Sequence, residues 1–349
     1  MDLQIVDIAQ RRRAFHDDSL RSRIVAGGWQ LATSACRVAA LALTHRVDVV
    51  HLNSSGGLGS VRDVVLAGIA RLGRRPFVYH LRFGRVPDIA RRNTVEWRLM
   101  AWVMRRSDAV IPIDPTTADA IRSRLADVRI VRIPNGAELD DIPQRAPTHA
   151  GQPGTVLFVA WVLPSKGVED LLTAWQERDR PGWRLLIAGP ADQEYVESLQ
   201  QTFAPLPNVA FVGELPHREA LRAMAAADLF VLPSHTEGFP NVIVEAMAVG
   251  CAIVATEVGA VSEMLEGGCG MVVPPRSPAR LAAALDELTA DPERRRQMGT
   301  LGRQKAHREY GMASVFDRYV QLWRSVTRPA IGESADAVAS DGRERAGSH

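Results

Sequence analysis

The stretch from residue 229 to residue 258 constrains the possible fold more than any other part of the chain. It reads LFVLPSHTEGFPNVIVEAMAVGCAIVATEV, with apolar runs at Leu229–Leu232 and Ala252–Val258. Between them, Val242–Val249 has the spacing of an amphipathic helix, and Gly250 follows where a helix C-terminus favours positive φ. Short apolar runs separated by a helix predict buried parallel strands in a β–α–β unit. We therefore expect an α/β domain around this stretch.

A polar loop, Ser234–Pro240, joins the first of these strands to the helix. In parallel sheets, ligands bind at the carboxyl ends of strands, beside helix N-termini whose free N–H groups favour anions. Glu237 lies in this loop, Gly238 allows the backbone to approach a ligand, and Glu245 lies eight residues after Glu237. An acidic first turn that complements the helix dipole would explain either glutamate alone, but not the Gly-Phe-Pro sequence between them. The loop is therefore a candidate ligand site.

The two glutamates and their spacing resemble a motif of the retaining GT-B glycosyltransferases of family 4. The family pattern is a glutamate, seven residues and a second glutamate followed by Ala-Met-Ala-x-Gly, and residues 237–250 read EGFPNVIVEAMAVG. The resemblance implies that Glu237 and the backbone after it hold the donor sugar, and that Glu245 holds the nucleotide ribose. The implied donor-binding residues of this segment are Glu237, Gly238, Phe239, Pro240, Asn241 and Glu245.

A second motif, Lys166-Gly167, resembles the family loop whose lysine contacts the donor diphosphate. A lysine that faces the helix beginning near Asn241 would stabilise the charge that builds on a leaving diphosphate. A solvated loop lysine is the alternative. The family has Gly-Arg five or six residues earlier, where the arginine also contacts phosphate, whereas this chain has Ala160-Trp161. The sequence therefore predicts a donor site that lacks one phosphate ligand of the family.

Two further segments complete the donor site that the resemblance implies. The segment Val212-Gly213-Glu214-Leu215 resembles the family loop that contacts the nucleotide base through its backbone. Gly189 ends an expected strand, Trp183–Ala188, at the same edge of the sheet. Gly189, Glu214 and Leu215 are therefore further donor-binding candidates.

Strand-like and helix-like segments also alternate in the first half of the chain. The segments Val47–Leu52, Phe77–Leu81, Ala109–Ile113 and Val128–Ile133 have the composition of buried strands, and Leu3–Ile8 alternates like another. Helical spacing separates them, which predicts a Rossmann-like domain.

His80 lies near the carboxyl end of the expected strand Phe77–Leu81, where we expect its side chain to point toward the other domain. The family has a histidine at the equivalent strand end that approaches the donor sugar, so the resemblance implies a catalytic role together with Lys166 and Glu237. A structural histidine is the alternative. Arg82 and Arg85 follow on the acceptor side, and they suit contacts with a phosphate on the acceptor unless they are simply solvated.

A chain of 349 residues favours two domains. We expect a GT-B fold, in which two Rossmann-like doubly wound domains face a cleft. The acceptor-side domain is assigned to residues 1–140, which end near Ile133-Pro-Asn-Gly136, a segment that resembles a family motif. The nucleotide-sugar domain is assigned to residues 155–312. Residues 313–328 are expected to form a helix that crosses back to the first domain, and residues 330–349 a disordered tail.

The start of the chain differs from the family. A GT-B first domain opens with a strand, a glycine-rich loop and a helix, whereas Leu3–Ile8 has no glycine-rich turn before it and looks like a later strand. We therefore expect a first domain that is truncated at its N-terminus, with an exposed sheet edge and weak activity. The alternative is that Ser54-Ser55-Gly56-Gly57 replaces the family's loop.

Composition and charge limit the class of protein. Hydrophobic residues make up 46% and charged residues 23%, as in soluble globular proteins, and no apolar run reaches the roughly 18 residues of a membrane helix. Cys36, Cys251 and Cys269 match no metal-binding pattern. Residues 1–148 hold 23 Lys and Arg against 15 Asp and Glu, a charge of +8, and the remainder holds 19 against 25, a charge of −6. We expect a cytoplasmic protein. The basic first half is explained either by peripheral contact with an anionic membrane or by chance surface charge.

The resemblance implies a retaining glycosyltransferase that moves a sugar from a nucleotide diphosphate sugar to an acceptor hydroxyl. The setting expected from the resemblance is cell-envelope polysaccharide or glycolipid synthesis, with a glycan or lipid-linked acceptor and with no metal, cofactor or nucleic acid. A relative that only binds nucleotide sugar or a partner, and a GT-B epimerase, remain alternatives. Two-carboxylate glycoside hydrolysis fits poorly, because Glu245 is assigned to ribose and not to the anomeric carbon.

Overall fold

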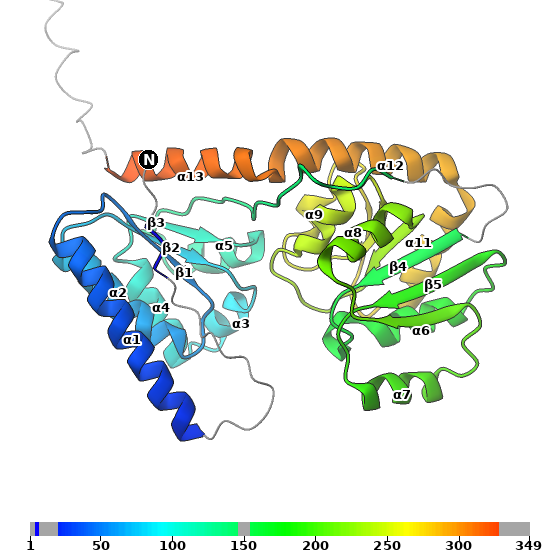
Figure 1. The fold of residues 1–349 in the computed structure, drawn as a ribbon, viewed down its shortest axis with the longest axis horizontal. Helices are drawn as coiled ribbons and strands as arrows, with labels where there is room; N and C mark the ends of the chain where they lie inside the picture. The colour runs from blue at the N-terminus through cyan, green and yellow to red at the C-terminus, as the bar shows by residue number, and fades with distance from the viewer. Residues whose placement is uncertain (1–3, 7–19, 146–153, 328–349) are drawn as a thin grey trace, which may run out of the picture.

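The structure is a computed structural model that describes residues 4–6, 20–145 and 154–327, with the backbone alone given for residues 20–31. It contains two parallel sheets, one in each half of the chain. Figure 1 shows two α/β bodies side by side, spanned along one side by α12 (Pro292–Lys305) and α13 (Met312–Thr327). The two bodies are the two expected Rossmann-like domains.

The first domain has a three-stranded sheet in the order β1-β2-β3. Its strands are β1 (Val50–Ser54), β2 (Phe77–Leu81) and β3 (Ala109–Pro112), and its helices are α1 (Leu20–Leu43), α2 (Gly59–Leu72), α3 (Val86–Arg91), α4 (Val95–Met104) and α5 (Pro115–Arg122). All five residues of β2 are buried. Because side chains alternate along a strand, Phe77, Tyr79 and Leu81 pack with α2 and α4, while Val78 packs with α13 on the opposite face.

The second domain has a six-stranded sheet in the order β6-β5-β4-β7-β8-β9. Its strands are β4 (Gly154–Val159), β5 (Trp183–Ala188), β6 (Val209–Gly213), β7 (Leu229–Leu232), β8 (Ala252–Thr256) and β9 (Met271–Val273). Its helices are the short 3-10 helix Pro164–Lys166, α6 (Val168–Gln176), α7 (Gln193–Thr202), α8 (His217–Ala226), α9 (Asn241–Ala248), α10 (Val261–Met264), α11 (Pro278–Ala290) and α12, followed by a π-helical turn, Ala306–Tyr310. The strand order reverses between β4 and β7, so the loops after these two strands diverge there, as at ligand sites of open α/β sheets.

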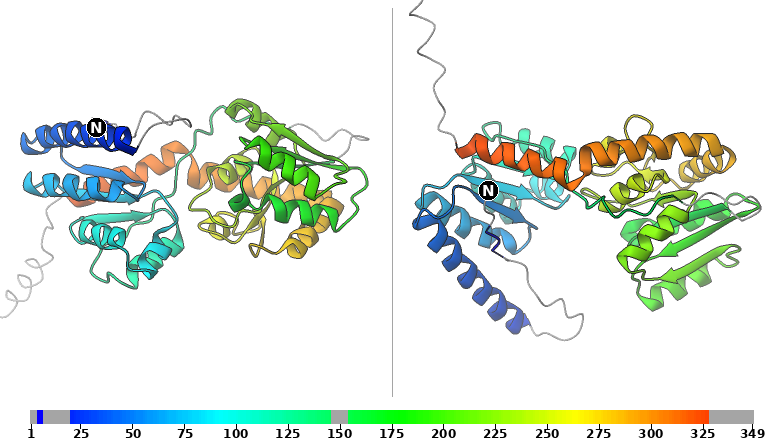
Figure 2. Two further views of the ribbon diagram at one scale, coloured as in Figure 1. Left: turned by 90° about the horizontal axis from the view of Figure 1, so that it is seen from below. Right: turned by 45° about the horizontal axis from the view of Figure 1, so that its top comes forward.

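Helix α13 returns to the first domain. Val315, Leu322 and Trp323 of this helix are buried against Val78 and Ile111 of the first sheet. Figure 2 shows the same helix lying along the first domain from two further directions. The carboxyl-terminal helix therefore forms part of the first domain's core. Over the part of the chain that the structure describes, no helix has the length and apolar character to cross a membrane.

Three features of the fold differ from the sequence-based expectations. The segment Val128–Ile133 is not a strand: the backbone groups of Arg129 and Val131 pair with Val110, which makes one isolated bridge at the sheet edge. The residues at positions 4–6 form no strand, and the rest of the segment 3–8, like the tail 330–349, lies outside the described residues. The short helices α3 and α10 were not expected, because six and four residues are too few to show helical periodicity.

Candidate active site between the two domains

Lys166 and Glu237 meet at the point where the strand order of the second sheet reverses. Lys166 ends the 3-10 helix after β4, and Glu237 lies in the loop after β7. The Lys166 Nζ donates to Glu237 Oε1 at 2.6 Å, and the buried Ser234 Oγ donates to the same oxygen at 2.7 Å. The side chains are 23% and 12% exposed, respectively. The carboxylate is thus held in one orientation, beside a lysine that solvent or a ligand can still reach.

The two loops are packed together through their backbones. Gly167 has φ of +69°, and a Cβ built on it would lie 2.0 Å from the carbonyl oxygen of Pro233. The His235 N–H donates to the Ser165 carbonyl at 2.9 Å, and the His235 Nε2 lies 2.8 Å from Asp170 Oδ2. Glycine at position 167 therefore allows the lysine loop to lie directly on the end of β7. Ser234, His235 and Asp170 were not identified from the sequence, because nothing in their spacing distinguishes them from other loop residues.

The N-terminus of α9 faces the same region. Pro240 precedes the helix, and no side chain caps it. The Asn135 Nδ2, near the end of the first domain, donates to Asn241 Oδ1 at 3.1 Å. Uncapped N–H groups at a helix N-terminus favour an anion. Asn135 therefore fixes the start of this helix from the side of the first domain.

Glu245 lies on α9 and faces α8. Its Oε1 is 3.1 Å from the Nε2 of His217, the first residue of α8. His217 comes two residues after Leu215, so the loop with Glu214 and Leu215 leads directly to Glu245. The structure thus brings the segment expected to contact the base close to the glutamate expected to contact ribose.

Gly189 directly follows β5 and packs against Ala160-Trp161, the two residues that replace the family's Gly-Arg. A Cβ on Gly189, whose φ is +144°, would lie 1.8 Å from the Ala160 carbonyl oxygen. Trp161 follows Ala160 and is 46% exposed. Gly189 therefore has a packing reason as well as its predicted donor role, and an exposed indole stands where the family has an arginine.

The first domain contacts the glutamate loop through the segment after β2. A Cβ on Gly84 would lie 2.6 Å from the Glu237 carbonyl oxygen and 3.0 Å from Gly238 Cα. Arg82 and Arg85 flank Gly84 and are exposed. The two domains therefore touch at the loop that carries Glu237, with the two arginines beside the contact.

Phe239 lies on the other side of this loop, next to a cavity of about 200 Å³ between the domains. Its ring packs edge-on against Tyr310 at 5.6 Å between centroids. Arg132 and Glu263 also line this cavity and form an ion pair that joins the two domains. Phe239 is thus a contact of the domain boundary.

The expected orientation of His80 is wrong. His80 is 1% exposed and packs beneath α13, with its Nδ1 3.4 Å from His51 Nε2 and its ring centroid 5.9 Å from that of Tyr319. Strand alternation places the side chains of residues 78 and 80 of β2 on the face of the sheet that α13 covers. Burial, the neighbouring His51 and Arg82 lower the pKa of His80 well below its ordinary value, so the ring is neutral.

Lys305 and the three cysteines are further side chains that can act as nucleophiles. Lys305 is buried, and its Nζ donates to the carbonyl oxygens of Glu263 and Glu266. Cys251 and Cys269 are buried free thiols, and Cys36 is exposed. No group of three or more His, Cys, Asp or Glu side chains among the described residues is arranged to hold a metal ion.

Comparisons with known proteins agree with this architecture. Residues 141–305 match the family model of glycosyl transferases group 1, and residues 9–141 match that of glycosyltransferase family 4. Glycogen synthase of Mycobacterium tuberculosis is 30% identical over 236 residues, which cover 65% of this chain and 56% of that protein. Alpha-maltose-1-phosphate synthase of Mycolicibacterium smegmatis is 33% identical over 186 residues, which cover 49% of this chain and 48% of that protein. The chain spans about half the length of the curated relatives it matches.

Solved structures show the same fold. HepE of Anabaena, in a complex with UDP, superimposes with a TM-score of 0.72 and 24% identity over 85% of this chain and 83% of that one. Sucrose-phosphate synthase of Thermosynechococcus elongatus superimposes with a TM-score of 0.69 and 22% identity over 85% and 78%. With the two family models together spanning residues 9–305, the chain belongs to the group 1, family 4 glycosyltransferases and has the GT-B fold.

Proposed function

We propose that this protein transfers a sugar from a nucleotide diphosphate sugar to an acceptor hydroxyl with retention of the anomeric configuration. The observation that carries the proposal is the position of Lys166 Nζ, 2.6 Å from Glu237, a residue of the loop that leads into the uncapped N-terminus of α9. A lysine and a helix N-terminus that face the same space are suited to a diphosphate. HepE of Anabaena, which has the same fold, was solved in a complex with UDP, and this supports a nucleotide as the ligand.

In the proposed reaction, the donor diphosphate lies between Lys166 and the first turn of α9, and Glu245 accepts hydrogen bonds from the ribose hydroxyls. The bond between the anomeric carbon and the diphosphate oxygen breaks, and Lys166 with the α9 dipole stabilises the negative charge that the leaving oxygen gains. The acceptor oxygen forms the new bond on the same face of the sugar, and its proton passes to the leaving phosphate. Glu237 and the backbone at Gly238 hold the sugar in place during this step.

We assign the acceptor to the side of the first domain, where Arg82 and Arg85 are exposed beside the contact with Glu237. A glycan or lipid-linked acceptor of cell-envelope polysaccharide or glycolipid synthesis is the class proposed. If it carries a phosphate, these arginines supply bidentate partners for it. This assignment is compatible with a cytoplasmic protein that works at a membrane surface.

The test is a turnover screen with a panel of nucleotide sugars and candidate acceptors. Release of nucleoside diphosphate that depends on acceptor, with a product of unchanged anomeric configuration by NMR, is the expected result. Inverted configuration would contradict the retaining mechanism. Turnover without acceptor would point instead to an epimerase, and tight binding without turnover to a protein that only binds nucleotide sugar.

A further inference from the structure

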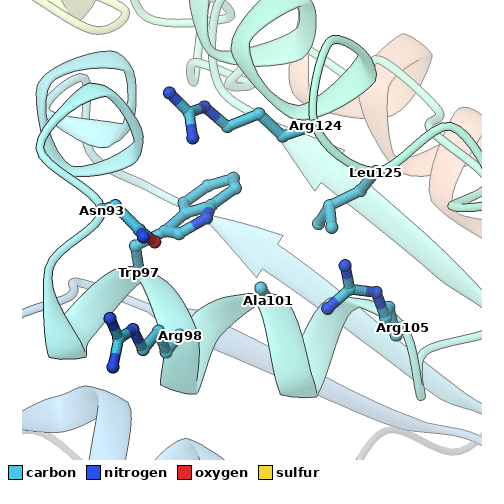
Figure 3. Close-up of a pocket in the computed structure, with 7 residues that line it drawn as sticks. All are labelled: Asn93, Trp97, Arg98, Ala101, Arg105, Arg124 and Leu125. Carbon is cyan, nitrogen blue, oxygen red and sulfur yellow. The ribbon is translucent and has the colours of Figure 1, made fainter.

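A pocket of about 330 Å³ lies on the first domain between α4 and the end of α5 (Figure 3). Its floor is formed by Trp97, Ala101 and Leu125, which are buried. Its volume lies in the range of small-molecule sites, about 300–1,000 Å³. All of its lining residues belong to the first domain, on α4 and in the segments after α3, α4 and α5. The pocket is therefore separate from the Lys166–Glu237 site.

The rim of the pocket is strongly basic. Arg98, Arg105 and Arg124 line it together with Asn93, and no lining residue is acidic. Figure 3 shows the three guanidinium groups arranged around the indole of Trp97, with Arg98 on α4, Arg105 directly after the end of α4 and Arg124 above them. Three positive charges that share one space repel each other, and an anion placed among them relieves that repulsion.

These three arginines also lack internal partners. Across the described residues, none of Arg98, Arg105 and Arg124 forms an ion pair or a side-chain hydrogen bond. Their neighbours differ: Arg91 pairs with Asp88, and Arg122 with Asp119. The three arginines whose side chains reach the pocket are therefore available to bind a ligand.

Asn93 adds a neutral donor to the rim. It follows α3 with φ of +48°, a left-handed conformation that asparagine adopts more readily than most residues. Its amide reaches the same pocket as the three arginines. A side-chain amide donates two N–H groups, which suits an oxygen-rich anion.

We propose that this pocket binds the phosphate group of a small ligand. Arginine presents two parallel donors that match phosphate oxygens, and a phosphate offers enough acceptor oxygens and negative charge to engage several guanidiniums at once. The buried floor accommodates a short apolar portion next to the phosphate. An anionic phospholipid headgroup and a soluble phosphorylated compound share this chemistry.

The test compares two triple variants with the same loss of charge. The pocket variant is Arg98→Gln with Arg105→Gln and Arg124→Gln. The control is Arg91→Gln with Arg106→Gln and Arg122→Gln, which removes three exposed arginines from the same region outside the pocket. Both carry Lys166→Ala, so that the candidate donor site does not contribute to phosphate binding, and both are checked by thermal melting for an intact fold.

Calorimetry with inorganic phosphate and with glycerol 3-phosphate is the first measurement. The pocket variant should bind about tenfold or more weakly than the Lys166→Ala parent, the scale of losing charged hydrogen bonds, while the control keeps the parent's affinity. Sedimentation with vesicles of phosphatidylglycerol and phosphatidylcholine is the second. A loss of vesicle binding confined to the pocket variant identifies a lipid headgroup, and equal vesicle binding with the calorimetric loss identifies a soluble phosphate compound. Equal binding of both probes by the pocket and control variants would overturn the proposal.

Discussion

Gly167 determines how closely the lysine loop approaches the end of β7. Its φ is +69°, and a Cβ would lie 2.0 Å from the Pro233 carbonyl oxygen. We expect Gly167→Ala to lower the free energy of unfolding by on the order of 1–3 kcal/mol and to displace Lys166, because both backbone strain and a clash are introduced. Urea unfolding measures the change. Gly182→Ala is the control, since its φ is +78° with no atom within 4 Å of the added Cβ; equal losses in the two variants would contradict the packing argument.

Glu245 is the proposed acceptor of the ribose hydroxyls. Glu245→Ala should weaken binding of a nucleoside diphosphate by roughly 1–3 kcal/mol, the scale of a charged hydrogen bond. The loss should disappear for a 2′,3′-dideoxynucleoside diphosphate, because the hydroxyls that Glu245 contacts are then absent. His217→Ala removes the side chain that contacts Glu245 in the structure and serves as the control. An equal loss of affinity for the ribose and the dideoxyribose nucleotide would show that Glu245 does not contact the ribose hydroxyls.

The residues of the site differ in how far the sequence could identify them. Lys166 and Glu237 stand in motifs with a known spacing, and the structure brings them into contact. Ser234 and His235 fix their loops, but they act through hydrogen bonds that depend on the three-dimensional approach of two strands. The orientation of His80 was missed because it depends on which face of β2 is covered by α13. The position of a residue along the strand does not decide this.

At the scale of elements, the attachment of α13 to the first sheet depends on a neutral histidine. The Trp323 Nε1–H of α13 donates to His51 Nδ1 of β1 at 2.9 Å. Burial, with Arg82 nearby, lowers the pKa of His51 from 6.5 to about 4. Burial also lowers the pKa of His80 beside it. Protonation of His51 would place a proton on the nitrogen that accepts from Trp323.

This arrangement predicts a loss of stability in mild acid. Below pH 6.5 the unfolded chain binds protons at His51 that the folded chain excludes, so stability is complete above pH 6.5 and falls as the pH is lowered toward 4. The contribution of His51 alone amounts to roughly 3 kcal/mol at the end of this window. Urea unfolding at several pH values should show the slope, and His51→Gln, which cannot titrate, should reduce it. An unchanged slope in His51→Gln would contradict this assignment.

Most elements of the second domain could be predicted from local pattern. The strands β5 and β7 have the bounds that their apolar runs indicated. The segment 128–133 has the same β-rich composition but pairs at one residue only, because pairing at a sheet edge depends on the neighbouring strand and not on composition. Short helices such as α10 carry too few residues for a periodic signal.

At the scale of the whole molecule, the two domains meet at several small contacts. Gly84 touches the Glu237–Gly238 backbone, Asn135 bonds to Asn241, and Arg132 pairs with Glu263. The donor-binding candidates all lie in the second domain. Donor binding and sugar transfer should therefore respond differently to a change at the domain contact.

Gly84→Val tests this separation. The added side chain would begin 2.6 Å from the Glu237 carbonyl oxygen and would push the domains apart. We expect the turnover number to fall about tenfold or more, because acceptor and donor are then misplaced, while the affinity for nucleoside diphosphate changes little. Gly68→Ala is the control, since no atom lies within 4 Å of its added Cβ. A parallel loss of nucleotide affinity would show that the first domain also builds the donor site.

The central claim is that Lys166 and the N-terminus of α9 bind the diphosphate of a nucleotide sugar. The most direct measurement is a pair of calorimetric titrations, one with a nucleoside diphosphate and one with the parent nucleoside, on the wild-type chain and on Lys166→Ala. We predict that Lys166→Ala lowers the affinity for the nucleoside diphosphate by roughly tenfold or more and leaves the affinity for the nucleoside unchanged, because Lys166 contacts only the phosphate groups. Equal diphosphate affinity in the two chains, or an equal loss for both ligands, would contradict the account.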